Sequence, residues 1–356
     1  MRHLLVRATR SVSPMLLLFV APCTVATQNS PVKDLPGLVS RLESLRRDYK
    51  IPGMSAAIVK GQAVAWSQGF GQADVAHGVA AADTTSYHLA SLTKTFASTI
   101  VMQLVEAGQL DLESPVADFG IVLPSSGIIR VKHLLTHTSE GTPGAVFSYN
   151  GNRFGELDKV IQQVTGESFA ERVERIILQP LQLRHTAPNL LSPVDFHRSG
   201  LDSATFQRNL AQGYSSDGRT PIAYPNYFGT AAGLMASALD VAQYSMAIDA
   251  NRFLTAETQA RVFTPAVSTQ GGTLPYGLGW FVQSYQGVRL QWHYGLWIGN
   301  SSLIIRVPER QLAFVLLANS DRLSAGTSLG AGELLSSPFA KAFLDGFVFG
   351  TATLPQ

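Results

Sequence analysis

The chain contains a single cysteine in 356 residues, Cys23, and it lies within the first thirty. A mature chain without that segment would have no thiol, which excludes disulfide bonds, cysteine nucleophiles and thiolate zinc sites. Charge is also scarce, because Asp, Glu, Lys and Arg make up 15% of the residues and the formal net charge is +2. Three arginines in the first ten residues more than account for this excess, so the composition indicates no nucleic-acid partner.

The N-terminal segment lacks an apolar run long enough for a membrane span. Its apolar stretch, residues 15–21, has seven residues, whereas a spanning helix needs roughly 20. Basic residues precede this stretch and small residues follow it, which is the layout of a secretory signal peptide. We expect residues 1–26 to be a signal peptide cleaved near Ala26, and the mature protein to be periplasmic or secreted with no stable membrane span.

Strand patterns stand near both ends of the remaining chain. Residues 54–75 read as two short strands joined by a Lys60-Gly61 turn, and four apolar segments between 276 and 320 suit an antiparallel meander. Helical patterns are predicted at 37–53, across much of 110–265 and at 331–349.

This order of elements predicts a single domain, residues 27–356, of the α+β class. An antiparallel sheet built from both chain ends and flanked by helices would use about 35–84 and 266–350, and an inserted, mostly helical subdomain would use about 85–265. A site at the seam between the two parts is the default expectation.

Ser91 and Lys94 stand three residues apart where a long apolar helix is predicted to begin. Residues at i and i+3 share a helix face, with about 5–6 Å between their Cβ atoms. A serine needs a neighbouring base, and a lysine can be that base if burial keeps it neutral. A serine that caps the helix while the lysine points to solvent has the same spacing, and Ser30 with Lys33 repeats the pattern. The pair by itself leaves both interpretations open.

The wider sequence around this pair resembles the serine β-lactamase-related family. The stretches that carry the resemblance are YHLASLTKTFASTIVMQLVEAGQLDLESPVADF, IRVKHLLTHTSE, AAGLMASALDVAQY, YGLGW and HYGLWIGNSSLIIRVPERQLAFVLLANSD, over about residues 35–320. The family includes class C β-lactamases, D-alanyl-D-alanine carboxypeptidases, penicillin-binding protein-like members and esterases. The resemblance implies a β-lactamase/transpeptidase-like fold and three site elements in chain order, S-x-x-K, Y-x-N and a strand with K-T-G or H-x-G. Ser91 and Lys94 match the first element.

The second element maps to Tyr149 in PGAVFSYNGNRFG, but with a departure from the pattern. Gly151 stands where the family has asparagine. We interpret Asn150 and Asn152 as candidates for the missing amide. The tripeptide at 224–226, YPN, fits the bare pattern but lies in the wrong segment, so Tyr149 is favoured.

The third element is WHYG, which places His293 and Gly295 on a strand. The resemblance implies that the N–H groups of Ser91 and Leu296 form an oxyanion hole and that Gly295 lets substrate backbone approach closely. His293 would help to position substrate or relay a proton. Because an unperturbed histidine is mostly uncharged at neutral pH, the site would hold a substrate carboxylate weakly.

The resemblance implies an exported serine hydrolase that acts through an acyl-enzyme on an amide or ester carbonyl of a small-molecule or peptide substrate, such as a D-Ala-D-Ala-type peptide, an ester or a β-lactam. No metal or other cofactor is expected, since the His133 and His137 pair lacks a glutamate general base between its members. The missing asparagine keeps a second hypothesis open, a catalytically inactive member that binds cell-wall peptide or a protein partner.

Overall fold

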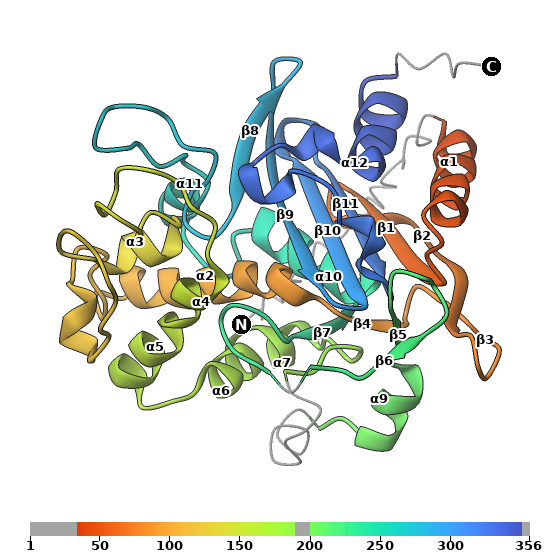
Figure 1. The fold of residues 1–356 in the computed structure, drawn as a ribbon, viewed down its shortest axis with the longest axis horizontal. Helices are drawn as coiled ribbons and strands as arrows, with labels where there is room; N and C mark the ends of the chain where they lie inside the picture. Colours follow the sequence, from red (N-terminus) through yellow and green to blue (C-terminus); the bar gives the residue numbers. More distant parts are fainter. Residues whose placement is uncertain (1–33, 189–199, 226, 351–356) are drawn as a thin grey trace, which may run out of the picture. The chain divides into compact units, whose positions relative to one another are not determined.

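A seven-stranded antiparallel sheet in the order β3-β2-β1-β11-β10-β9-β8 lies at the centre of the fold (Figure 1). The computed structural model describes residues 34–188, 200–225 and 227–350, so the predicted signal peptide and Asn226 of the alternative YPN motif lie outside the described residues. The strands are β1 Gly53–Lys60, β2 Ala63–Asp74, β3 Val79–Ala80, β8 Phe281–Tyr285, β9 Val288–Trp297, β10 Asn300–Val307 and β11 Leu312–Ala318. Strand β1 pairs with β11, from Met54 opposite Ala318 to Lys60 opposite Leu312. The prediction of one sheet built from both ends of the chain is therefore confirmed.

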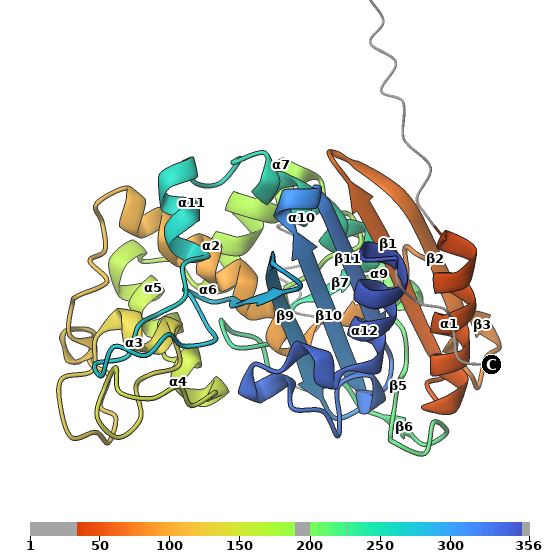
Figure 2. The ribbon, with the colours of Figure 1, turned by 90° about the horizontal axis from the view of Figure 1, so that it is seen from above.

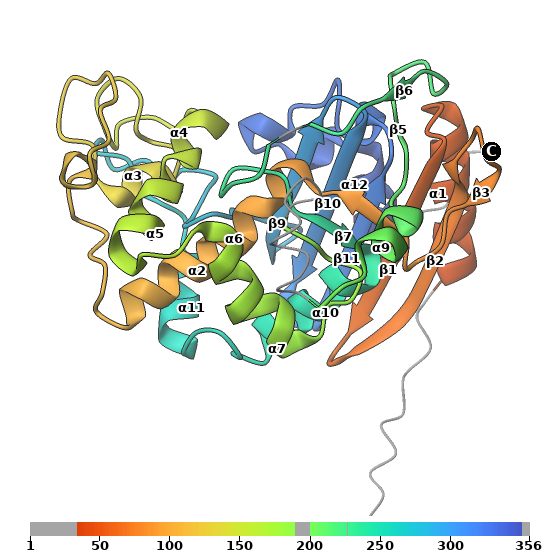
Figure 3. The same cartoon turned by 90° about the horizontal axis from the view of Figure 1, so that it is seen from below.

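The two faces of the sheet are both covered by helices, which explains why its central strands are apolar throughout. In β1, Ala56 and Ile58 belong to one core cluster, and Ala57 and Val59 to the other. This alternation follows from the two-residue period of a strand. Helices α1 (Leu35–Asp48) and α12 (Pro338–Phe343) lie side by side on the first face (Figure 2). Helices α2 (Thr93–Glu106) and α10 (Ala238–Asp249) lie on the second (Figure 3).

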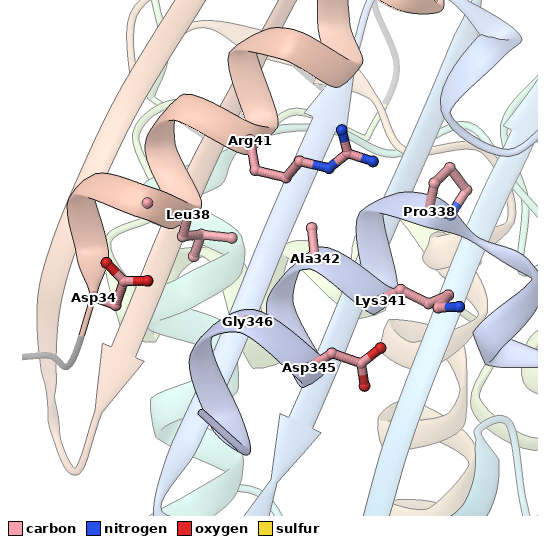
Figure 4. Close-up of a pocket in the computed structure, with 9 residues that line it drawn as sticks. Asp34, Leu38, Arg41, Pro338, Lys341, Ala342, Asp345 and Gly346 are labelled. Carbon is pink, nitrogen blue, oxygen red and sulfur yellow. The ribbon is translucent and has the colours of Figure 1, made fainter. Parts of the chain in front are cut away.

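A cavity of about 300 Å³ lies between α1 and α12 (Figure 4). Charged side chains of both helices line it, including Arg41, Lys341 and Asp345. It belongs to the sheet face opposite α2, and the predicted nucleophile is not among its lining residues. The site must therefore be sought elsewhere.

Short helices make up the segment between β3 and β8, as predicted. They are α3 Val131–Leu135, α4 Gly151–Gly155, α5 Leu157–Thr165, α6 Phe169–Val173, α7 Gln179–Leu181, α9 Ser203–Asn209 and α11 Ala256–Val262, with the strand pairs β4 Ser86–His88 with β7 Met235–Ser237 and β5 Gly213–Tyr214 with β6 Pro221–Ile222. In α5, Leu157, Val160 and Ile161 are buried at helical spacing. The helix ends at Gly166, whose φ of 73° suits a residue without Cβ. No helix in the described part of the chain is long and apolar enough to cross a membrane.

Three predicted elements differ from the structure. The helix expected near 233–248 begins as strand β7, because Met235–Ser237 pairs with β4. The strand expected from 276 begins at Phe281, because the Gly277 N–H closes a turn on the Trp280 carbonyl. The final helix is broken before Pro338, where the missing proline N–H favours a helix start over a helix interior.

Candidate active site

Ser91 lies in a short 3₁₀ turn, Ala90–Leu92, between strand β4 and helix α2. Ala90 has a φ of 49°, a left-handed conformation that costs a non-glycine residue roughly 1–2 kcal/mol. The Ala90 N–H donates to Nδ1 of the buried His88 at 3.1 Å, which holds this conformation. The Ser91 side chain remains partly accessible, as a nucleophile requires.

Lys94, on the first turn of α2, is completely buried with its Nζ 3.0 Å from Ser91 Oγ. The Nζ also donates to the Ala231 carbonyl at 2.7 Å. The rings of Tyr149 and Phe154 stand 5.2 and 5.3 Å from it. Burial lowers the pKa of Lys94 to about 7. A large fraction of this amine is therefore uncharged at neutral pH, and a neutral amine at this distance can take the Ser91 proton.

Tyr149 lies directly before α4, and its hydroxyl is buried without a hydrogen-bond partner of good geometry. Burial raises the pKa of Tyr149 well above its ordinary value, and the neighbouring Tyr294 adds to this, while the Ser91 hydroxyl acts in the opposite direction. Tyr149 is therefore a protonated phenol at neutral pH. This favours Lys94 as the proton acceptor and Tyr149 as a proton donor to a leaving group.

Gly151 stands beside Lys94, at the position where the family motif has asparagine. A Cβ at this position would stand 3.7 Å from Lys94 Nζ. The two candidate replacements are directed elsewhere. Asn150 accepts the Arg153 N–H at 3.1 Å, capping α4, and its amide donates to Glu140. Asn152 is exposed, so the structure brings neither predicted amide to the lysine.

Gly295 allows strand β9 to lie against the turn that carries Ser91. A Cβ on Gly295 would stand 2.1 Å from the Leu89 carbonyl oxygen and 3.1 Å from the Ala90 Cβ. The first distance is too short for any Cβ and the atom it would meet belongs to the backbone, so packing within the protein already requires glycine here. Leu296 follows on β9, and its side chain is 41% exposed. Its N–H as an oxyanion donor stays a prediction.

His293 is fully buried, and both of its ring nitrogens are engaged. Nδ1 donates to the Tyr294 carbonyl at 2.7 Å, so Nε2 must accept the hydroxyl hydrogen of Tyr276 at 2.8 Å. Burial and the charge of Lys94 lower the pKa of His293 to about 3. His293 is thus a neutral part of the wall beside Tyr149, with ring centroids 6.2 Å apart.

His137 and Tyr276 complete the surroundings of Tyr149, although the sequence predicted neither as a site residue. His137 Nδ1 accepts the Asn150 N–H at 3.1 Å, and its ring centroid stands 4.2 Å from that of Tyr149. His133 Nδ1 instead accepts the Arg130 N–H, and helix α3 ends between the two histidines. The signal for both missed residues was their place in HLLTH and YGLGW, two stretches of the family resemblance.

Comparison with known proteins finds relatives over most of the chain. The sequence profile of the family described as Beta-lactamase matches residues 38–332. Protein flp of Staphylococcus aureus strain MW2 is 25% identical over 311 residues, covering 76% of this chain and 60% of that protein. This chain therefore spans less than two thirds of that relative's length.

Solved structures share the fold at low sequence identity. A penicillin-binding protein homologue from Pyrococcus abyssi, described as octameric, superposes with a TM-score of 0.75 at 24% identity, covering 89% of this chain and 78% of that one. The D-alanine carboxypeptidase AmpC from Burkholderia cenocepacia gives a TM-score of 0.68 at 19% identity, covering 80% and 93%. With the family profile spanning most of its length, this chain belongs to the Beta-lactamase family of serine β-lactamase-related proteins.

Proposed function

We propose that this protein is an exported serine hydrolase that acts through an acyl-enzyme. The observation that supports it most directly is the 3.0 Å approach of Lys94 to Ser91 Oγ, since this lysine is fully buried and burial lowers its pKa to about 7. A lysine that only capped or solubilised a helix would gain nothing from burial, since desolvation of an ammonium is costly. Perturbed groups of this kind cluster at functional sites.

The proposed reaction has two half-reactions. Ser91 Oγ attacks the carbonyl carbon while its proton passes to Lys94 Nζ, and backbone N–H groups of Ser91 and Leu296 hold the developing oxyanion. The leaving alcohol or amine departs with a proton returned through Lys94 and Tyr149. Water then attacks the acyl-enzyme, gives one proton to the same pair, and releases the carboxylic acid with Ser91 restored.

The substrate proposed at this level is any small molecule or peptide with a reactive amide or ester carbonyl, including D-Ala-D-Ala-type peptides, esters and β-lactams. The structural neighbours, a penicillin-binding protein homologue and a D-alanine carboxypeptidase, support the peptide end of this range. A second candidate is a binder that keeps the fold without turnover. The glycine at position 151, beside Lys94 where the family motif has asparagine, is the observation that favours it.

Intact-mass spectrometry after incubation with a fluorescent penicillin or a fluorophosphonate tests the proposal. One adduct per chain is expected, lost in Ser91→Ala and retained in the control Ser126→Ala, whose side chain is exposed on the loop before α3. The lifetime of the penicillin adduct separates slow deacylation from turnover. A folded protein that forms no adduct with either probe would contradict the hydrolase and favour the binder.

A further inference from the structure

The first turn of α5 carries a partly buried carboxylate that the proposed mechanism does not use. Asp158 is the second residue of this helix, which directly follows α4 (Figure 3). Burial raises the pKa of Asp158 to about 6. Among the described residues no cation forms an ion pair with it, and the neighbouring Lys159 is paired with Glu156. Because an unpaired carboxylate gains nothing from burial, its presence here points to a task other than stabilising the fold.

The Asp158 carboxylate holds a short turn of the chain against α5. Its Oδ1 accepts the N–H of Thr230 at 2.8 Å. Its Oδ2 would stand only 2.4 Å from a Cβ on Gly229, so the glycine lets the backbone of the turn lie directly on the carboxylate. The Gly229 N–H donates to the Ala232 carbonyl at 3.0 Å, and the Thr230 hydroxyl donates to the Phe154 carbonyl of α4 at 3.3 Å. The turn is thus closed on itself and fastened to both helices.

The residue after Thr230 provides the hydrogen-bond acceptor of the proposed base. The carbonyl of Ala231 accepts from Lys94 Nζ at 2.7 Å, and the same Nζ lies 3.0 Å from Ser91 Oγ. A neutral amine that donates one N–H to this carbonyl keeps its lone pair available for the serine proton. A displacement of Thr230 would move the adjacent Ala231 carbonyl, and the orientation of the amine would change with it.

We infer that Asp158 is a positioning residue for Lys94. By holding the Thr230 N–H, its carboxylate aims the Ala231 carbonyl at Nζ and so directs the amine toward Ser91 Oγ. Asp158 acts through the turn, so it is not itself a catalytic residue. This inference rests on the proposed hydrolase function and adds to its machinery a residue outside the three sequence elements of the family.

The rate of fluorophosphonate labelling, measured by intact mass from pH 5 to 9.5, tests this inference. Asp158→Ala should lower the plateau rate by about tenfold or more, because small displacements of a reacting group are costly. The midpoint of the pH curve should also move down by about half a pH unit or more, since an ammonium that has lost its carbonyl acceptor gives up its proton more readily.

Two further variants separate the hydrogen bond from the charge. Asp158→Asn has no charge but keeps an oxygen that can accept the Thr230 N–H, so it should recover the rate to within about threefold of wild type, with the wild-type midpoint. Glu156→Ala removes a carboxylate that is bonded to Lys159 at the same end of α5, and it should leave both the rate and the midpoint unchanged.

Circular dichroism and the melting temperature of each variant establish that it is folded. An Asp158→Ala protein with the wild-type rate, or with a lower rate and an unchanged midpoint, overturns the inference and leaves the hydrolase proposal standing. An Asp158→Asn protein slowed to the extent expected of Asp158→Ala does the same, and this variant decides the matter if Asp158→Ala does not fold. Folded wild-type protein that forms no adduct overturns both.

Discussion

Replacing Lys94 with methionine should abolish acylation and at the same time stabilise the fold. Methionine is an unbranched side chain one heavy atom shorter than lysine, and it removes an amine that is completely buried. Burial lowers the pKa of Lys94 from 10.5 to about 7. At 1.36 kcal/mol per pKa unit, burial of the Lys94 charge destabilises the folded state by about 5 kcal/mol at any pH where the folded and unfolded chains both carry the Lys94 proton. Methionine would leave the Ala231 carbonyl without this donor, at a cost of about 1–3 kcal/mol, so a net gain of about 2–4 kcal/mol is expected.

The stability difference between Lys94→Met and the wild type should depend on pH. Below about pH 7 the folded and unfolded chains both carry the Lys94 proton, so the cost is fully present. Between pH 7 and 10.5 the unfolded chain binds more protons at Lys94 than the folded chain does. The free energy of unfolding of the wild type must therefore rise with pH over this range. The advantage of Lys94→Met should therefore be largest at pH 6 and shrink toward pH 10.

Urea unfolding at pH 6, 8 and 9.5 measures the difference directly, with Lys159→Met as the matched control because Lys159 is 56% exposed on the surface of α5. The control should differ little from wild type at every pH. A Lys94→Met protein that is less stable than wild type at pH 6, or an advantage that does not narrow with pH, would refute the account of Lys94 as a lysine neutralised by burial.

Three further predictions concern the site. The rate of acylation should rise with pH through about 7 and then level off, because only deprotonated Lys94 accepts the Ser91 proton; a stopped-flow pH series in which the rate falls over this range would contradict Lys94 as base. Gly151→Asn should move the midpoint of that curve to higher pH, because an amide oxygen beside Lys94 Nζ stabilises the ammonium form. Gly151→Ala offers no acceptor and should move the midpoint less. Equal shifts in the two variants would argue against the position of residue 151 beside Lys94. Gly295→Ala should lower the melting temperature and abolish fluorophosphonate labelling, because the new Cβ would stand 2.1 Å from the Leu89 carbonyl oxygen. Labelling of this variant at the wild-type rate would show that β9 does not lie against the turn that carries Ser91.

The elements that the sequence predicted well are those whose patterns are local. Short, nearly continuous apolar runs place β1 and β11, and the three-residue spacing brings Lys94 to Ser91. The contacts that escaped prediction join distant segments. Nothing local to His293 indicates that the Tyr276 hydroxyl fills its Nε2, and nothing local to Asn150 indicates that its N–H is held by His137. Pairing with β4 likewise overrides the helical pattern at Met235–Ser237.

The position of β1 in the sheet has a consequence for how the chain acquires its structure. One of its two neighbours, β11, lies some 260 residues further along, and a strand cannot complete its hydrogen bonds before its partner has been synthesised. The N-terminal third of the chain therefore emerges from the ribosome with β1 able to pair only with β2, and the sheet is completed only when Leu312–Ala318 arrives. Pairings this distant fold slowly. Until then, the edge of β1 that pairs with β11 keeps its backbone N–H and C=O groups without their partners in the sheet.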